Sequence, residues 1–281
     1  MRVQSLHLHP VKGMRASNVA QARIEARGLA GDRRWLATDE QGGFLTQRTA
    51  PALARIDAAV IEGGLRLSKG DRSIELAAPS GQRRQVTVWN DTVDAADAGD
   101  EAARWLSDAV GRPARLYFMD NAAARATSGR WGPQRPVSFA DAYPILIANK
   151  ASLDALNEAI IANGGEAVPM KRFRPNIVVE GAGPWAEDFW KAIRVGGVEI
   201  DLVKPCDRCI VTTLDPATGE KTGREPLKTL HKIRRSVHPD LPNVVLFGWN
   251  AAPRGEGEIA IGDAVEIIEA RPEGWPLAPL G

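Results

Sequence analysis

The sequence predicts an α+β fold that is rich in β-strands and carries a few peripheral helices. Short strand-like segments separated by Gly or Asp recur from residue 1 to about residue 117. Helical periodicity is confined to a few segments, and a polar stretch with Gly and Pro, 120–136, divides the chain. Short strands at this spacing are typical of a barrel or a sandwich.

The first predicted strands lie before residue 90. Val3, Leu6 and Leu8 come close to alternating with polar residues, as in a half-buried strand. Residues 33–38 and 44–46 flank a turn that contains two glycines, which predicts a hairpin. Further short strands are expected at 58–61, 65–67, 73–76 and 85–89.

A helix is expected next, over residues 96–110. Ala96, Ala103, Leu106 and Val110 share a stripe, and Gly111 ends it. A strand follows at 116–118. We therefore predict an amino-terminal domain at 1–119 and a linker or mobile loop at 120–136, where Gly and Pro interrupt a polar segment.

The second half mixes strands with two helices and is predicted to form a domain at 137–270, followed by a tail at 271–281. An amphipathic helix is expected at 151–160 and a short one after Pro226. The expected strands share β-branched or alternating residues and lie at 177–179, 198–202, 210–213, 244–247 and 264–268.

Charge and hydropathy exclude several classes of protein. The 281 residues include 36 Lys plus Arg and 35 Asp plus Glu, so no overall field favours nucleic acid or an anionic membrane. No secretory signal or membrane span is apparent, which predicts a cytoplasmic protein without nucleic-acid or membrane partners. Any anion site must be local.

The two cysteines, Cys206 and Cys209, are three residues apart. Two sulfurs cannot supply an all-cysteine zinc site or an iron–sulfur cluster. Half-buried thiols remain one reading. A redox pair is disfavoured because a β-branched run follows rather than a helix. The third reading is a single thiolate ligand or nucleophile, which Lys204 and Arg208 would help to ionise.

Basic residues beside turns offer local anion contacts. Arg174 and Asn176 precede the strand at 177, where Pro175 should bias Arg174 towards an extended conformation. Lys12 and Arg33 lie next to glycines. Each would alone be an ordinary surface cation, but Arg can bind phosphate or carboxylate through two hydrogen bonds.

Other chemistries have no support in the sequence. There is no Walker A loop, dinucleotide fingerprint, His-Glu-x-x-His pattern or nucleophile elbow. His7 and His9 would share one face of a strand, but no third ligand is in view, so a structural role is expected.

Four motifs occur in order along the chain: Pro-Val-Lys at 10–12, Gly-Asp-Arg-Arg-Trp at 31–35, Phe-Arg-Pro-Asn-Ile-Val at 173–178 and Cys-Asp-Arg-Cys-Ile-Val-Thr-Thr-Leu-Asp-Pro-x-Thr-Gly at 206–219. This ordered set resembles the MOSC superfamily with its amino-terminal β-barrel domain, and within it the YcbX-like proteins and the mitochondrial amidoxime reducing component. The resemblance spans nearly the whole chain. It implies a MOSC β-barrel core and an amino-terminal β-barrel-like domain.

The resemblance also implies a site. In that family the cysteine before the Ile/Val-x-Thr-Thr segment binds molybdenum, which falls on Cys209, while basic residues hold the pterin and its phosphate. By position, the implied cofactor contacts are Lys12, Arg33, Asp141, Arg174 and Asn176. A soft thiolate suits molybdenum and arginine suits phosphate.

The implied activity is that of a molybdenum cofactor-dependent oxidoreductase reducing N-hydroxylated compounds, such as amidoximes and N-hydroxylated bases. The sequence stops at Gly281 without a ferredoxin-like module, so electrons are expected from a separate ferredoxin, flavin reductase or cytochrome-type protein. Pyridoxal phosphate is not expected. Two alternatives stay open: a sulfurtransferase using a Cys209 persulfide, and a non-catalytic carrier of the cofactor.

Overall fold

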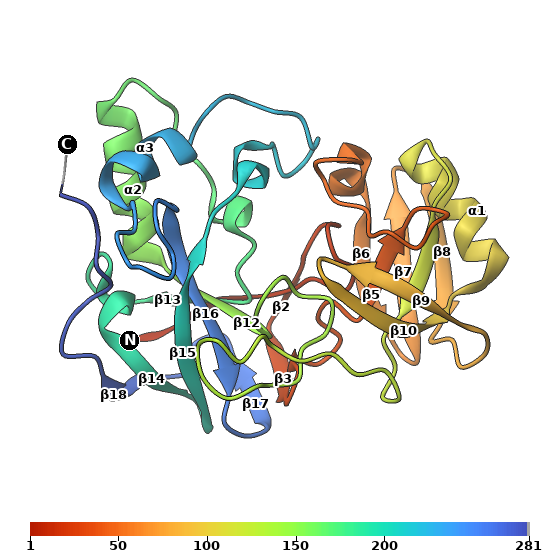
Figure 1. Cartoon of the computed structure of the whole chain (residues 1–281), viewed down its shortest axis with the longest axis horizontal. Coiled ribbons are helices and arrows are strands. Elements are labelled where there is room, and N and C mark those ends of the chain that lie inside the picture. Colours follow the sequence, from red (N-terminus) through yellow and green to blue (C-terminus); the bar gives the residue numbers. More distant parts are fainter. Residues whose placement is uncertain (280–281) are drawn as a thin grey trace.

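An eight-stranded sheet forms the larger of two lobes in the computed structural model, which describes residues 1–279 (Figure 1). Neighbouring strands are antiparallel except for one parallel pair, β12 and β13. In spatial order the strands are β18 (Val265–Ala270), β14 (Trp190–Val195), β15 (Val198–Asp207), β16 (Leu246–Pro253), β12 (Ile145–Asn149), β13 (Ile177–Glu180), β1 (Arg2–Leu8) and β2 (Ser17–Val19).

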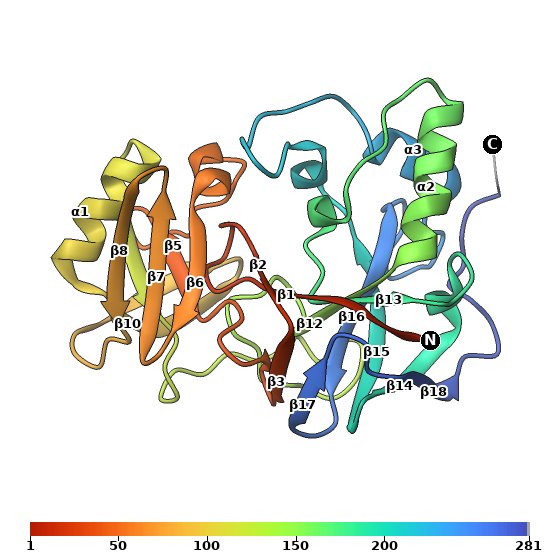
Figure 2. The same cartoon turned by 180° about the vertical axis from the view of Figure 1, so that it is seen from behind.

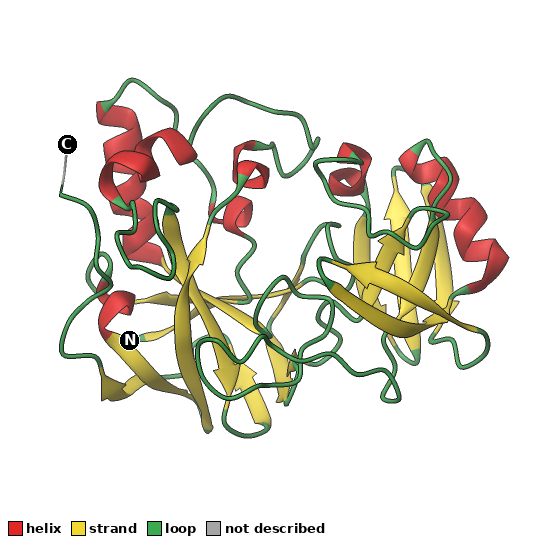
Figure 3. Ribbon diagram, in the orientation of Figure 1, coloured by secondary structure: helices red, strands yellow, loops and turns green. Residues whose placement is uncertain are grey.

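A small sheet and two α-helices complete the larger lobe. The small sheet has the order β17 (Gly257–Ala260), β3 (Gln21–Glu25) and β4 (Gly28–Leu29). Helices α2 (Lys150–Ala162) and α3 (Leu227–Ile233) lie on the outside of the lobe (Figure 3). Leu153, Leu156 and Ile160 are buried in one cluster with Leu230, so the predicted helix at 151–160 is confirmed.

The smaller lobe packs two sheets and one α-helix. Leu65 and Leu67 are buried while Arg66 between them is exposed, which is the alternation of a half-buried strand. One sheet has the order β5 (Trp35–Thr38), β11 (Arg115–Phe118), β10 (Asp91–Asp97) and β9 (Arg83–Val88); the other is β6 (Asp57–Ile61), β7 (Gly64–Lys69) and β8 (Arg72–Ala77), with α1 (Gly99–Val110) against them. The predicted α+β, β-rich class is confirmed.

The two lobes do not divide at one point of the chain. Strand β1 pairs with β13 and β3 pairs with β17, so the first residues complete the larger lobe before the chain enters the smaller one (Figure 2). The division into 1–119, 120–136, 137–270 and 271–281 stays a prediction. Residues 280 and 281 of the predicted tail lie outside the described residues.

The segment 120–136 carries no helix or strand, and its first residues are bound to their surroundings. Arg27 donates to the carbonyl oxygens of Asp120 at 3.1 Å and Ala123 at 2.6 Å, and Arg83 pairs with the Asp120 carboxylate. Ala126 and Pro136 form an isolated bridge. The first bonds hold the start of the segment, and the bridge closes the segment on itself.

The predicted strand at 210–213 is wrong. These residues form a 3₁₀ turn, η4 (Ile210–Thr213). The Thr212 hydroxyl donates to the Cys209 carbonyl at 2.9 Å, and the Thr213 hydroxyl donates to the Ile210 carbonyl at 2.8 Å. These local side-chain bonds compete with strand pairing and outweigh the β-preference of the residues.

Two predicted starting points of helices or strands also differ from the structure. Helix α1 begins at Gly99 rather than at 96, because Ala96 belongs to β10 and the Asp97 carboxylate accepts from the Gly99 amide at 2.8 Å. Strand β16 begins at Leu246 rather than at 244. Three further 3₁₀ turns, η1 (Pro51–Arg55), η2 (Met170–Phe173) and η3 (Ala186–Phe189), were not predicted. Among residues 1–279 no helix has the length and apolar character needed to cross a membrane.

Candidate functional site

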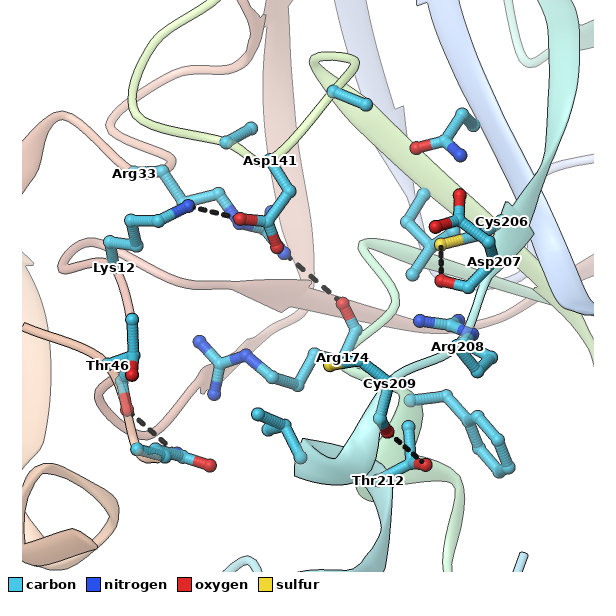
Figure 4. Close-up of a pocket in the computed structure, with 18 of the residues that line it drawn as sticks. Lys12, Arg33, Thr46, Asp141, Arg174, Cys206, Asp207, Arg208, Cys209 and Thr212 are labelled. Carbon is cyan, nitrogen blue, oxygen red and sulfur yellow. Dashed lines mark hydrogen bonds and ion pairs between the residues drawn. The ribbon is translucent and has the colours of Figure 1, made fainter. Parts of the chain in front are cut away.

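A cavity of about 410 Å³ lies where loops of both lobes meet (Figure 4). Lys12 and Thr46 stand on one wall and Cys206 and Arg208 on the opposite wall, with the Arg174 side chain between them. The structure brings all six predicted site residues to the lining of this cavity: Lys12, Arg33, Asp141, Arg174, Asn176 and Cys209.

The lining is strongly cationic although the chain as a whole is almost neutral. Two acidic residues, Asp141 and Asp207, line the cavity. They face seven basic residues: Lys12, Arg33, Arg48, Arg172, Arg174, Lys204 and Arg208. Such a local excess of positive charge attracts an anionic ligand.

Lys12 is buried and held by two oxygens. Its Nζ donates to the Phe139 carbonyl at 2.8 Å and to the Asp141 carboxylate at 2.5 Å. Burial lowers the Lys12 pKa and Asp141 opposes this effect. Shielding by the cavity walls would raise the Asp141 pKa, but the Lys12 ammonium and the Trp89 indole, which donates at 3.0 Å, keep it well below the usual range. The Asp141 carboxylate is therefore charged at neutral pH.

Arg33 is fixed by a buried acid and by a neighbouring strand. Its guanidinium pairs with the Asp32 carboxylate and donates to the Asn176 side-chain oxygen at 3.0 Å. It also donates to the Arg174 carbonyl at 3.3 Å. Burial raises the Asp32 pKa, while Arg33 and the His9 amide, 2.7 Å from the carboxylate, oppose that rise. Arg33 thus has a defined orientation before any ligand arrives.

Asn176 is fully buried, and its side-chain amide is hydrogen-bonded to other groups of the protein. The side-chain oxygen accepts from the Leu146 amide and from Arg33, both at 3.0 Å. The side-chain nitrogen donates to the His7 carbonyl at 3.2 Å. Asn176 therefore ties β1 and β12 to Arg33, and its oxygen is already occupied by two donors.

Arg174 does not have the extended conformation expected from Pro175. Its φ is 54° and its ψ is 46°, because it closes the 3₁₀ turn η2 with its amide bonded to the Lys171 carbonyl at 3.3 Å. Its side chain donates to the Met14 carbonyl at 2.7 Å. Burial and then the nearby Arg33 lower its pKa to about 10, so it stays charged at neutral pH.

Backbone strain gathers at this cavity. Five residues other than glycine have a positive φ in the described chain, and three of them, Arg33, Trp89 and Arg174, line it. A left-handed conformation is unfavourable for a large side chain and is typical of functional sites. Trp89 occupies the two-residue turn between β9 and β10 and remains 44% exposed.

The two cysteines differ in their surroundings. Cys206 belongs to β15 and is partly buried, with its sulfur 3.6 Å from the Asp207 carbonyl, and burial raises the pKa of its thiol. Cys209 is exposed at the start of η4. In residues 1–279 no three His, Cys, Asp or Glu side chains are arranged to hold a metal ion. A metal bound at Cys209 would need ligands from outside the protein.

Other lining residues were not predicted as site residues. Lys204 pairs with Asp207 at 2.7 Å. Arg208 lies over the Phe173 ring at 5.3 Å and donates to the Phe247 carbonyl at 2.9 Å, leaving its Nη2 buried without a partner. The position of Arg208 within the cysteine motif could have identified it. Trp89 and Arg48 carry no such signal, because each comes from a short loop of the smaller lobe.

Comparison with known proteins gives consistent matches over both lobes. Residues 1–113 match the MOSC N-terminal beta barrel domain, and residues 134–266 match the MOSC domain. The chain is 31% identical to mitochondrial amidoxime-reducing component 1 of Mus musculus, covering 95% of this chain and 82% of the relative. It is 30% identical to component 1 of Xenopus laevis, covering 94% and 81%. It is 31% identical to component 2 of Homo sapiens, covering 94% and 82%.

Proposed function

Because this chain belongs to the MOSC family that includes the amidoxime-reducing components, we propose that it is a molybdenum cofactor-dependent reductase of N-hydroxylated compounds. The relatives are named for amidoxime reduction. The observation that best supports the assignment is one exposed thiol in a cavity with seven basic and two acidic residues.

The residues fit an anionic cofactor that brings its own metal ligands. Cys209 offers one soft thiol as a metal ligand. The described residues contain no group of three or more His, Cys, Asp or Glu side chains that could hold a metal ion without other ligands. Arg208 has a buried nitrogen without a partner, and Arg174 forms no ion pair with a carboxylate in residues 1–279. A phosphate-bearing pterin would supply the missing acceptors.

We assign distinct roles to the lining residues. Cys209 is the proposed metal ligand, and Lys12, Arg33 and Arg174 compensate the negative charge of the cofactor. Asp141 fixes Lys12, to which it is bonded at 2.5 Å. Asn176 acts as a positioning residue, because its oxygen already holds Arg33 at 3.0 Å.

Cys206 is proposed to remain a neutral thiol. Burial raises its pKa, so at neutral pH it carries its proton and competes weakly for a metal. The bound cofactor would supply the two-electron chemistry. In the net reaction the N–O bond of an amidoxime breaks, two electrons and two protons are taken up, and the products are an amidine and water.

The electrons are proposed to come from a separate protein of the ferredoxin, flavin reductase or cytochrome type. The relatives are named amidoxime-reducing components, and we take the word component to indicate one part of a reducing system. The substrate is proposed to be a small N-hydroxylated molecule. The predicted cytoplasmic location stays a prediction.

Turnover of benzamidoxime tests this function. The full chain is produced in a host that makes the molybdenum cofactor and is assayed for benzamidine with a chemically reduced viologen as electron donor. We expect benzamidine in proportion to the molybdenum content. Protein that is fully loaded with cofactor but forms no benzamidine would favour a carrier role instead.

A sulfurtransferase is the second candidate, because the exposed Cys209 could hold a persulfide. Its test is separate from turnover. Molybdenum-free protein that carries labile sulfur on Cys209 and transfers it to cyanide would support this alternative and contradict the reductase.

A further inference from the structure

A second cavity, of about 530 Å³, adjoins the first, and Arg174 lines both. The two cavities share four wall residues, Gln47, Arg172, Arg174 and Val211. The second is lined in addition by segments of the larger lobe that the proposed function does not use. It therefore needs an explanation of its own.

Basic groups dominate this second lining. No acidic residue contributes to the wall, whereas four cations and two histidines do: Arg15, Lys171, Arg172, Arg174, His7 and His9. Like charges confined to one cavity repel one another, and an anion bound between them offsets this repulsion.

The cations of the second cavity are incompletely matched by acids of the protein. Arg15 pairs with Asp57 at 3.3 Å. Arg172 bonds through Nη2 to the Thr222 hydroxyl at 2.7 Å, but its Nε is buried without a partner. Burial lowers the Arg172 pKa, and Asp215 partly offsets this from outside the lining. Arg174 forms its side-chain bond with a carbonyl group, which carries no net charge.

His9 also contributes to the lining of this cavity. It is 2% exposed, its Nε2 lies 3.1 Å from the Pro175 carbonyl, and its Nδ1 is buried without a partner. Donation from Nε2 to this carbonyl leaves a bare lone pair on Nδ1. Burial, Arg174, Arg33 and His7 all keep its pKa low. An anion nearby would favour protonation of Nδ1 and convert it into a donor.

We propose that the second cavity binds a phosphate-like oxyanion. Phosphate offers several acceptor oxygens, and guanidinium, ammonium and imidazolium groups are suitable donors for it. The oxyanion is either free phosphate or the phosphate of a substrate. The proposal rests on residues of this chain and does not depend on the proposed reductase activity.

Calorimetric titration of the cofactor-free full chain with inorganic phosphate tests the proposal. We expect saturable binding of one phosphate per chain. Lys171→Glu should weaken the binding at least about tenfold, because a charge-assisted contact becomes a repulsion. Lys228→Glu is the matched control, since Lys228 is also exposed but lines neither cavity. It should leave the affinity unchanged.

Histidine NMR adds a measurement that surface charge alone would not affect. Phosphate should shift the His9 ring resonances towards those of the protonated form in wild-type protein and in Lys228→Glu. The absence of saturable phosphate binding, or an equal loss of affinity in both lysine variants, would overturn the proposal.

Repeating the titration on cofactor-loaded protein distinguishes the sources. If phosphate binds as before, the cavity receives a free or substrate-borne oxyanion. If the loaded protein no longer binds phosphate while the cofactor-free protein does, the phosphate had bound where the cofactor's own phosphate lies. The first result supports the proposal, and the second would overturn it, because the phosphate would then belong to the cofactor site already proposed.

Discussion

Lys12 and Asp141 show that one ion pair can affect its two members unequally. The Lys12 side chain is 10% exposed and bears most of the cost of leaving water, whereas the Asp141 side chain is 72% exposed. The lowered Lys12 pKa reflects this cost, and the lowered Asp141 pKa reflects the attraction. The pair therefore positions an ammonium group in the cavity more than it stabilises the fold.

Substitution of the two members should differ accordingly. Asp141→Asn leaves a buried ammonium without its counter-charge and should lower the free energy of unfolding by about 1–3 kcal/mol at pH 7. Lys12→Met removes the buried charge and leaves a solvated carboxylate. It should therefore lower the free energy of unfolding less than Asp141→Asn does. Urea unfolding of both variants measures the difference.

The same pair sets a pH dependence. Because the Asp141 pKa is lowered in the folded protein, its favourable contribution is present above the ordinary carboxyl pKa of about 4. It should be lost as the pH falls through the lowered value. The stability gap between wild type and Asp141→Asn should thus narrow below about pH 4. A gap that stays constant would contradict the assignment.

At the residue level, sequence motifs located the candidate site better than they described its contacts. All six predicted residues line one cavity. The role of Asn176 was not predictable, because its partners Leu146 and His7 are 30 and 169 residues away. The conformation of Arg174 depends on the turn η2, which outweighs the usual influence of the following proline.

At the scale of the elements, the Asn176 side chain links three strands beside the cavity. It lies just before β13 and is hydrogen-bonded to β12 and β1. Asn176→Ala removes bonds to the Leu146 amide, the His7 carbonyl and Arg33. We expect the free energy of unfolding to fall by about 2–4 kcal/mol, since buried polar groups lose their partners. Chemical denaturation measures this loss.

Asn250→Ala is the matched control for this junction. Asn250 is also buried and lines the same cavity, but its side chain makes one hydrogen bond, at 3.4 Å to the Pro205 carbonyl. Asn250→Ala should lower the free energy of unfolding clearly less than Asn176→Ala does. Equal losses in the two variants would show that Asn176 is not the main link between these strands.

The elements also show why part of the fold escaped prediction. The hairpin at 33–46 and helix α2 were foreseen from local turn and periodicity signals. Strand β12 is buried at all five positions and therefore lacks the alternation by which strands were recognised. The turn η4 was missed because threonine hydroxyls close it locally.

At the scale of the whole molecule, a loop of the larger lobe is bonded to the smaller lobe beside the cavity. Arg55 donates to the Thr218 carbonyl at 3.0 Å and pairs with Glu220 at 3.0 Å. Gly219 lies against the Pro51 carbonyl with a φ of 77°. The sequence could not reveal this contact, because it joins turns that are far apart in the chain.

Gly219→Ala should loosen the junction between the lobes. A Cβ atom there would lie 2.3 Å from the Pro51 oxygen, so one of the two turns must move. Gly164→Ala is the control, because Gly164 has a φ of 76° and open space around it. We expect Gly219→Ala to destabilise the protein by about 1–3 kcal/mol more than the control in thermal or urea unfolding. Equal losses of stability in the two variants would mean that the two turns can move apart without destabilising the protein.

At the cavity between the two lobes, we propose that Cys209, and not Cys206, binds molybdenum. Molybdenum content per chain, measured by elemental analysis of protein from a cofactor-producing host, tests it most directly. We expect wild-type protein to contain the metal, Cys209→Ala to lose it, and Cys206→Ala to retain most of it. Equal loss in both variants, or full retention in Cys209→Ala, would contradict the claim.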